Sequence, residues 1–173
     1  MQKPSITIVV PIYEGVEFLN ELLDAIKSQS IKAEETIFVV SKSRDSDSIE
    51  SKLSHQESQN IKYKLVDRLY PGEARNLGVE LSKSTWIAFL DLRTLPSKRW
   101  LESLIKASDN GRYEFVGALR TCVADTPYKR ILKASTYGNA PSNALSGSLV
   151  SRKLFNSSKG FVPNVRAGED LEW

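Results

Sequence analysis

The chain has 173 residues, of which 40% are hydrophobic and 26% charged, and a net charge of +3 at pH 7. This composition is typical of one folded globular domain, and the small net charge argues against a nucleic-acid-binding protein. A single cysteine, Cys122, excludes an internal disulfide and a cysteine-rich zinc site, and a single histidine, His55, in a polar stretch argues against a Ser-His-Asp triad.

Apolar β-branched runs alternate with amphipathic segments along the first two thirds of the chain. In chain order this pattern predicts a strand at 5–11, a helix at 16–28, a strand at 36–40, a helix from Ser48, a strand at 61–66, a helix at 73–82, a strand at 85–90, a helix from Pro96 and a strand at 115–119. Asp47 and Glu50 are the expected capping box of the second helix, and Ala74, Leu77 and Leu81 the inward face of the third. Residues 121–148 lose the periodicity, which predicts a long irregular segment with some strand near its end.

Strands that alternate with helices of these lengths predict a single α/β domain with a mostly parallel central sheet and helices on both faces. Such Rossmann-like sheets bind ligands beyond the carboxyl ends of their strands. No G-x-G-x-x-G, G-x-x-x-x-G-K-[ST] or G-x-S-x-G motif is present, which argues against dinucleotide-binding, P-loop and α/β-hydrolase functions. The residues that follow the predicted strands are Tyr13, Glu14, residues 41–47, Asp67, Arg68, residues 91–94 and Arg120.

Three stretches of the chain are similar, in order and spacing, to segments of one enzyme family. IVVPIYEGVEFLNELLDAIKSQS resembles a first strand, a Pro-x-Tyr turn and a first helix, and PGEARNLGVELSKSTWIAFLDLRTLP resembles an Ala-Arg-Asn-x-Gly helix followed by a strand and an aspartate motif. SGSLVSRKLFNSSKGFVPNVRAGEDLEW resembles an acceptor-side stretch that ends on a Glu-Asp pair. The family is the family 2 glycosyltransferases of the GT-A fold, and the resemblance implies a nucleotide-sugar-binding domain over residues 1–173.

The resemblance implies a site for a sugar-nucleotide donor. Pro11 and Tyr13 form the Pro-x-Tyr turn, where Tyr13 would offer an aromatic face to the nucleoside and Glu14 a carboxylate to its hydroxyls. Packing on the sheet end and capping of the next helix are the structural alternatives for these two residues. Arg75, in the Ala-Arg-Asn segment, would contact the nucleotide or its phosphates, or else form a surface ion pair.

Asp91 directly follows a predicted strand, where carboxylates of the family bind ribose and a divalent cation, Mn²⁺ or Mg²⁺. Asp91 is therefore the expected metal ligand, unless it only caps the following turn. The family has Asp-x-Asp here, whereas this chain has Asp91-Leu92-Arg93, and arginine cannot ligate a cation. Arg93 could place its own charge against the donor diphosphate, which predicts weak metal dependence or none. The alternative is a degenerate site that no longer turns over.

Glu169 and Asp170 match the family's Glu-Asp pair, and the resemblance implies that Asp170 is the catalytic base for the acceptor hydroxyl. A single base permits direct displacement, so we expect transfer with inversion. The loop SKSRDSDS after the second strand has Ser41 and Lys42 where the family has acidic residues. Asp45 or Asp47 would then contact the nucleobase from a shifted register.

These interpretations predict a transferase that moves a sugar from a nucleotide-diphosphate donor to a carbohydrate or lipid-linked acceptor in polysaccharide or cell-envelope glycan synthesis. A non-catalytic nucleotide-sugar-binding module is the alternative, favoured by Arg93 and by the altered SKSRDSDS loop. Members of the family usually continue past the Glu-Asp pair, so we expect the sequence to be truncated at its C-terminal end. Hydrolysis of a donor that depends on Asp170 would separate the two interpretations.

A cytoplasmic location is expected, because no apolar run approaches ~20 residues and the start MQKPSITIVVPIY has no signal-peptide cleavage site. Lys129, Arg130 and Lys133 form a basic cluster that could contact anionic lipid at the inner face of a membrane. A solvated basic helix face is the simpler interpretation of this cluster.

Overall fold

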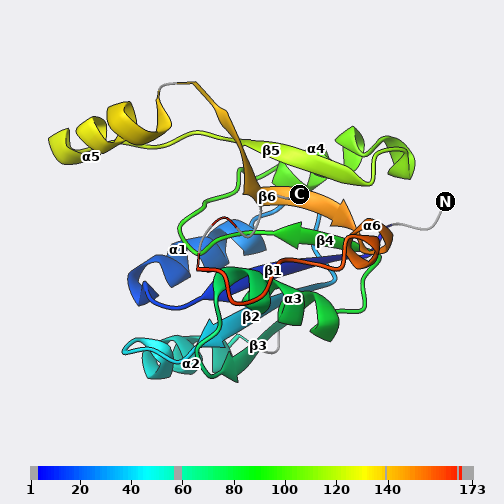
Figure 1. The fold of residues 1–173 in the computed structure, drawn as a ribbon, viewed down its shortest axis with the longest axis horizontal. Helices are drawn as coiled ribbons and strands as arrows, with labels where there is room; N and C mark the ends of the chain where they lie inside the picture. The colour runs from blue at the N-terminus through cyan, green and yellow to red at the C-terminus, as the bar shows by residue number, and fades with distance from the viewer. Residues whose placement is uncertain (1–3, 57–59, 139, 167, 169–173) are drawn as a thin grey trace.

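The computed structural model describes residues 4–56, 60–138, 140–166 and 168, which form one α/β domain around a six-stranded sheet (Figure 1). The strands are β1 (Ile6–Ile12), β2 (Glu35–Ser41), β3 (Ile61–Val66), β4 (Trp86–Phe89), β5 (Phe115–Arg120) and β6 (Ser142–Ser151). Their spatial order is β3-β2-β1-β4-β6-β5. The first four strands pair in parallel, whereas β6 runs antiparallel to both of its neighbours. The predicted α/β class with a mostly parallel sheet is thereby confirmed.

Helices cover both faces of this sheet, as predicted. The helices are α1 (Val16–Lys27), α2 (Ser46–Ser54), α3 (Pro71–Leu81), α4 (Trp100–Ala107), α5 (Pro127–Leu132) and α6 (Arg152–Ser157), with short helical turns η2 (Asp109–Gly111) and η3 (Lys133–Tyr137). α1, α2 and α4 pack on the face that presents Ile8, Val10 and Phe38. α3 and α6 pack on the opposite face, which presents Val9 and Phe89.

The central strands are apolar because both of their faces are covered. Successive side chains of a strand point to opposite faces, so a strand between two helix layers buries every position. Ile8, Val9 and Val10 of β1 are all fully buried, and every residue of β2 is buried. The parallel arrangement brings the carboxyl ends of β1, β2 and β4 to one edge of the sheet.

Three predicted helix starts are wrong, and one of them is that of α3, which begins at Pro71 and not at Glu73. α2 begins at Ser46 instead of Ser48, and the residue before it is Asp45, not Asp47. The capping box expected there does not form, because the Glu50 carboxylate accepts a hydrogen bond from the Tyr63 hydroxyl, 3.1 Å away.

The fourth helix begins at Trp100 and not at Pro96. The indole Nε1 of Trp100 donates to the Gly147 carbonyl of β6 at 2.7 Å, so the start of α4 is fixed against the sheet while the residues before it remain outside the helix. A further correction concerns Leu81, which was predicted to point inward. It is the last residue of α3 and is 43% exposed.

Residues 121–148, predicted as irregular, contain regular structure as well: α5, the π-helical turn η3 and the first part of the ten-residue strand β6. The serine-rich sequence SNALSGSLVS gives β6 little apolar signal, and the strand is defined by its pairing with β4 and β5. The fifth predicted strand, β5, therefore joins the sheet through antiparallel β6 and lies at the edge. In the described part of the chain, no helix has the length and apolar character needed to cross a membrane.

Candidate functional site

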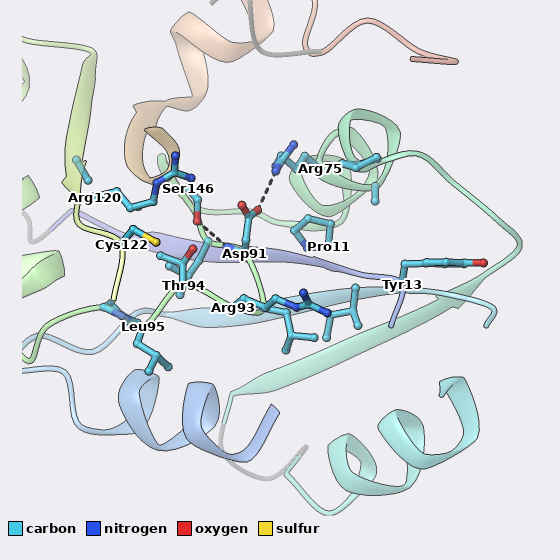
Figure 2. Close-up of a pocket in the computed structure, with 18 of the residues that line it drawn as sticks. Pro11, Tyr13, Arg75, Asp91, Arg93, Thr94, Leu95, Arg120, Cys122 and Ser146 are labelled. Carbon is cyan, nitrogen blue, oxygen red and sulfur yellow. Dashed lines mark hydrogen bonds and ion pairs between the residues drawn. The ribbon is translucent and has the colours of Figure 1, made fainter. Parts of the chain in front are cut away.

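A cavity of about 1140 Å³ opens at the carboxyl ends of β1 and β4. Its walls come from the ends of these strands, the start of α3, the loop 91–97 and parts of β5 and β6 (Figure 2). This is the edge where open α/β sheets bind ligands, and the volume suffices for a ligand of nucleotide size.

Asp91 lies at the centre of the cavity, two residues after the end of β4 (Figure 2). Its backbone N–H donates to the Ser146 hydroxyl of β6 at 2.8 Å, which fixes the turn that follows the strand. Its carboxylate Oδ1 accepts a hydrogen bond from Nη2 of Arg75 at 2.8 Å (Figure 2). The Asp91 side chain is 41% exposed, so the carboxylate keeps a face open to a ligand.

Arg75 reaches Asp91 from the second turn of α3. The helix begins with Pro71 at its first position, and the Glu73 carboxylate accepts a hydrogen bond from the backbone N–H of Tyr70 at 3.0 Å. The Arg75 side chain is only 7% exposed, and its guanidinium lies 5.7 Å from the ring centre of Phe161. The ion pair with buried Arg75 therefore holds the half-exposed Asp91 carboxylate in one orientation.

The cavity lining is strongly basic. The described residues that line it include one acidic side chain, Asp91, and five arginines, which are Arg68, Arg75, Arg93, Arg120 and Arg166. Guanidinium groups match the oxygens of phosphates in shape and charge. The lining therefore favours an anionic ligand such as a phosphate or diphosphate.

Besides Arg75, two more of these arginines lie against aromatic rings. The Arg68 guanidinium lies 5.7 Å from the ring centre of Tyr13, and the Arg93 guanidinium lies 4.9 Å from the ring centre of Phe18 in α1. Tyr13 is 46% exposed and can offer the rest of its ring to a ligand. Figure 2 places Tyr13 at one end of the cavity and Arg120 at the other.

Five of the predicted site residues line the cavity, namely Pro11, Tyr13, Arg75, Asp91 and Arg93. Glu14 is not among the lining residues, and its carboxylate lies 3.4 Å from the guanidinium of Arg44. Glu169 and Asp170 lie outside the described residues.

Asp45, predicted to contact the nucleobase, also lies apart from the lining residues, at the start of α1. Its carboxylate accepts hydrogen bonds from the backbone N–H groups of Gly15 and Val16, at 2.8 and 3.4 Å. These bonds, that from Gly15 foremost, and the charge of Arg44 hold the pKa of the Asp45 carboxyl below its ordinary value. Asp45 thus caps α1 from the neighbouring loop.

The sequence profile of glycosyl transferase family 2 matches residues 7–162. The chain belongs to this family. The amylovoran biosynthesis glycosyltransferase AmsB of Erwinia amylovora is 31% identical over 94 residues, which cover 53% of this chain and 31% of AmsB. The chain thus spans less than a third of the length of that relative.

Solved glycosyltransferase structures share the fold of this family 2 chain. TarS 1–349 of S. aureus in complex with UDP-GlcNAc superposes with a TM-score of 0.70 at 16% identity, over 96% of this chain and 51% of TarS. The mannosyltransferase PcManGT of Pyrobaculum calidifontis, in complex with GDP-Man and Mn²⁺, gives a TM-score of 0.67 at 19% identity, over 95% of this chain and 49% of PcManGT. At these identities the likeness shows the fold alone, and it is the GT-A fold.

The described residues of this family 2 chain do not fit a divalent cation at Asp91. They include no group of three or more His, Cys, Asp or Glu side chains placed to hold an ion. One oxygen of Asp91 already accepts from Arg75, and the residue two positions on is a cation, Arg93. Mg²⁺ is usually held by one or two carboxylates together with substrate phosphates. Here the described residues offer one partly engaged carboxylate, and the neighbouring arginines repel a cation, so the site for a metal is weak.

Sequence reasoning assigned no role to several lining residues of this family 2 site. Arg68 and Arg120 were marked only because they follow predicted strands, and Ser146 lies in the SGS stretch without a predicted partner. Arg166 lies in a stretch without the apolar periodicity that would predict a helix or a strand there. The one sequence signal available was the position just after a predicted strand. It marked two of these four lining residues, Arg68 and Arg120.

Proposed function

We propose that the cavity binds the nucleoside diphosphate of a sugar donor and that this family 2 chain transfers the sugar to an acceptor hydroxyl. The observation that carries the proposal is the set of five arginines around Asp91, the one acidic side chain among the described lining residues, at the carboxyl ends of β1 and β4. A nucleoside diphosphate brings two phosphates and a ribose, which need cations and a hydroxyl acceptor. The complexes of TarS with UDP-GlcNAc and of PcManGT with GDP-Man support a donor of this class.

In this proposal, different lining residues contact the nucleobase, the ribose and the diphosphate of the donor. Tyr13, with Arg68 over one part of its ring, stacks against the nucleobase at one end of the cavity. The exposed oxygen of Asp91 accepts hydrogen bonds from the ribose hydroxyls. Arg75 holds the Asp91 carboxylate in place and adds positive charge near the diphosphate.

Arginine, and not a divalent cation, neutralises the diphosphate in this proposal. The leaving nucleoside diphosphate gains negative charge as its bond to the sugar breaks, and fixed cations next to it lower the barrier. Arg93 stands where a second metal-binding aspartate is common in the family, and the ring of Phe18 holds its guanidinium at the cavity wall.

The chemical step is a direct displacement. The acceptor oxygen attacks the anomeric carbon of the sugar, and the bond from that carbon to the phosphate oxygen breaks with both electrons leaving on the nucleoside diphosphate. The acceptor proton passes to the carboxylate of Asp170, with Glu169 beside it. Attack on the side opposite the leaving group inverts the anomeric centre. The roles of Glu169 and Asp170 rest on their match to the family's Glu-Asp pair.

The acceptor is a hydroxyl of a carbohydrate or of a lipid-linked glycan. The name of the relative AmsB, an amylovoran biosynthesis glycosyltransferase, supports a polysaccharide or cell-envelope product.

A donor-turnover assay tests the proposal. The chain is incubated with UDP-, GDP- and dTDP-linked sugars, and the released nucleoside diphosphate is measured. We expect release from one donor and a loss of about 100-fold or more in Asp170→Asn, as for removal of a general base. Asp24→Asn, which removes an exposed carboxylate of α1, is the control and should keep full activity.

A non-catalytic nucleotide-sugar-binding module is the second candidate, favoured by Arg93 in place of the family's second aspartate. This function predicts donor binding without release of nucleoside diphosphate, and no effect of Asp170→Asn. Turnover that depends on Asp170 would rule it out.

A further inference from the structure

We propose that residues 119–133, here called the basic arm, dock the protein on an anionic lipid surface. The arm runs from the end of β5 through α5, and Figure 1 shows α5 set apart from the other labelled helices. The inference does not depend on donor binding, since no residue of α5 lines the cavity.

The arm carries a concentration of exposed apolar side chains. Leu119, Val123, Tyr128 and Ile131 are 72%, 80%, 70% and 68% exposed, and Leu132 is also exposed. No residue of α5 is buried. Leu119 and Val123 also line the cavity, whereas Tyr128, Ile131 and Leu132 lie outside its lining. Exposed apolar side chains that occur singly need no explanation, but three on one short helix mark a surface that binds something.

The apolar and basic side chains of α5 lie on opposite sides of the helix. Tyr128, Ile131 and Leu132 are spaced i, i+3 and i+4 and therefore share one face. Lys129 and Arg130 fall on the other face. A helix with an apolar face and a Lys/Arg-rich face is suited to lie in the interface of a bilayer, with the cations at the level of the headgroups.

The charge of the arm favours anionic lipid over another copy of the chain. The arm has four basic side chains (Arg120, Lys129, Arg130 and Lys133) and one acidic side chain (Asp125), a net charge of +3 that equals the net charge of the whole chain. The rest of the molecule is thus neutral overall, and the excess positive charge is located beside the exposed apolar residues. A second copy would bring a like charge against the arm, whereas anionic lipid complements it.

The arm also contributes Leu119, Arg120 and Val123 to the cavity lining. Docking of the arm therefore places the opening of the cavity near the lipid surface, where a lipid-linked acceptor would be found.

Vesicle binding of the whole chain tests the inference. The probes are vesicles of phosphatidylcholine alone and vesicles with about one third phosphatidylglycerol, compared at low and high salt by co-sedimentation. We expect binding that is at least about tenfold tighter to the anionic vesicles and that weakens as salt shortens the Debye length to about 3 Å at 1 M. Equal binding to both vesicles, or no binding at low salt, would overturn the inference.

Two matched double variants distinguish the effect of charges in the arm from the effect of the net charge of the chain. Lys129→Gln with Arg130→Gln removes two charges from the arm, and Arg112→Gln with Lys153→Gln removes two exposed charges from elsewhere. The arm variant should lose most of the vesicle binding and the control should keep it. An equal loss in both would overturn the inference, because it would reflect overall charge.

The apolar contribution is tested by Tyr128→Ser with Ile131→Ser, whose exposed side chains can change without disturbing the core. This variant should keep the thermal midpoint and lose vesicle binding. Retained binding would contradict insertion of the apolar face. A shift from dimer to monomer in size-exclusion chromatography, without vesicle binding by the parent chain, would show that the arm joins two copies instead.

Discussion

Arg75 and Asp91 are sixteen residues apart in the sequence, and each was predicted as a donor-binding residue from the motif around it. Their ion pair was not predictable, because it depends on how α3 packs on β1 and β2 and so faces the residues that follow β4. The same limit applies to Asp45, which was expected at the nucleobase and instead caps α1 through Gly15 and Val16. Sequence patterns identify residues suited to a site, whereas packing decides which of them face one another.

Replacement of Arg93 by aspartate tests the charge that it supplies. Arg93→Asp exchanges a cation for an anion beside Asp91, so nucleoside diphosphate affinity without metal should fall about tenfold or more, equivalent to about 1.4 kcal/mol. Two carboxylates two residues apart can ligate a cation, so Mn²⁺ should restore part of the affinity in the variant. Isothermal titration calorimetry measures both effects.

Arg112→Asp is the control for this experiment, because Arg112 is also exposed and lies 5.5 Å from an aromatic ring, but does not line the cavity. It should leave affinity unchanged. If Arg93→Asp also left affinity and metal dependence unchanged, Arg93 would have no role in neutralising the diphosphate.

Glu35 of β2 links stability to pH. Burial alone would raise the pKa of its carboxyl, but hydrogen bonds from Lys62 Nζ, the Lys83 backbone N–H and Thr7 Oγ1 outweigh it. The pKa of Glu35 is therefore below its ordinary value, and the ionised carboxylate stabilises the fold above the pKa of the unfolded chain. This contribution is lost as the pH falls through the folded-state pKa.

We expect Glu35→Gln to be less stable than the parent chain at about pH 7, and the difference in free energy of unfolding to shrink as the pH falls to about 3. Urea denaturation at a series of pH values measures it. Glu80→Gln, which changes an exposed carboxylate of α3, should differ little from the parent at every pH. A constant difference for Glu35→Gln across the range would contradict the linkage.

At the scale of elements, the sequence predicted the bounds of strands best where a continuous apolar pattern indicates a buried strand. β1, β2 and β3 lie within a residue of their predicted ranges, because strands buried on one or both faces leave a clear apolar signature. The start of α4 was misplaced because Pro96 is a good first helical residue, whereas the bond from Trp100 to Gly147 fixes the actual start. β6 was predicted only as some strand near the end of residues 121–148, and its extent was missed because strand pairing, and not side-chain pattern, determines it.

The approach of α3 to β1 depends on Gly78. A Cβ at this position would lie far inside van der Waals contact with Cγ1 of the fully buried Val9. Gly78→Ala should therefore cost about 1–3 kcal/mol of unfolding free energy, measured by urea denaturation. Gly117→Ala in β5 is the control, since its Cβ would meet only an ordinary contact 3.7 Å away.

The double variant Gly78→Ala with Val9→Ala identifies the cause of this cost. Removal of the Val9 methyl groups makes room for the new Cβ, so the double variant should lose less stability than the sum of the two single variants. Additive losses would show that the close contact is not the source of the destabilisation.

At the scale of the whole molecule, the parallel strands supply the rigid base of the cavity, while β5 and β6 supply its opposite wall. Fold class, sheet edge and family membership were all predictable from the sequence, because they depend on the order of elements and on three motifs that resemble those of the family. The basic character of the lining was only partly predictable, since its five arginines come from five separate segments of the chain. Their convergence is a property of the folded molecule.

The most direct test is calorimetric titration of the chain with UDP, GDP, dTDP and CMP, each in EDTA and in Mn²⁺. We predict that one nucleoside diphosphate binds in EDTA and that Mn²⁺ changes its dissociation constant by less than about threefold, because the arginines already supply the positive charge. Binding that requires Mn²⁺, or no binding of any nucleotide, would contradict an arginine-based donor site.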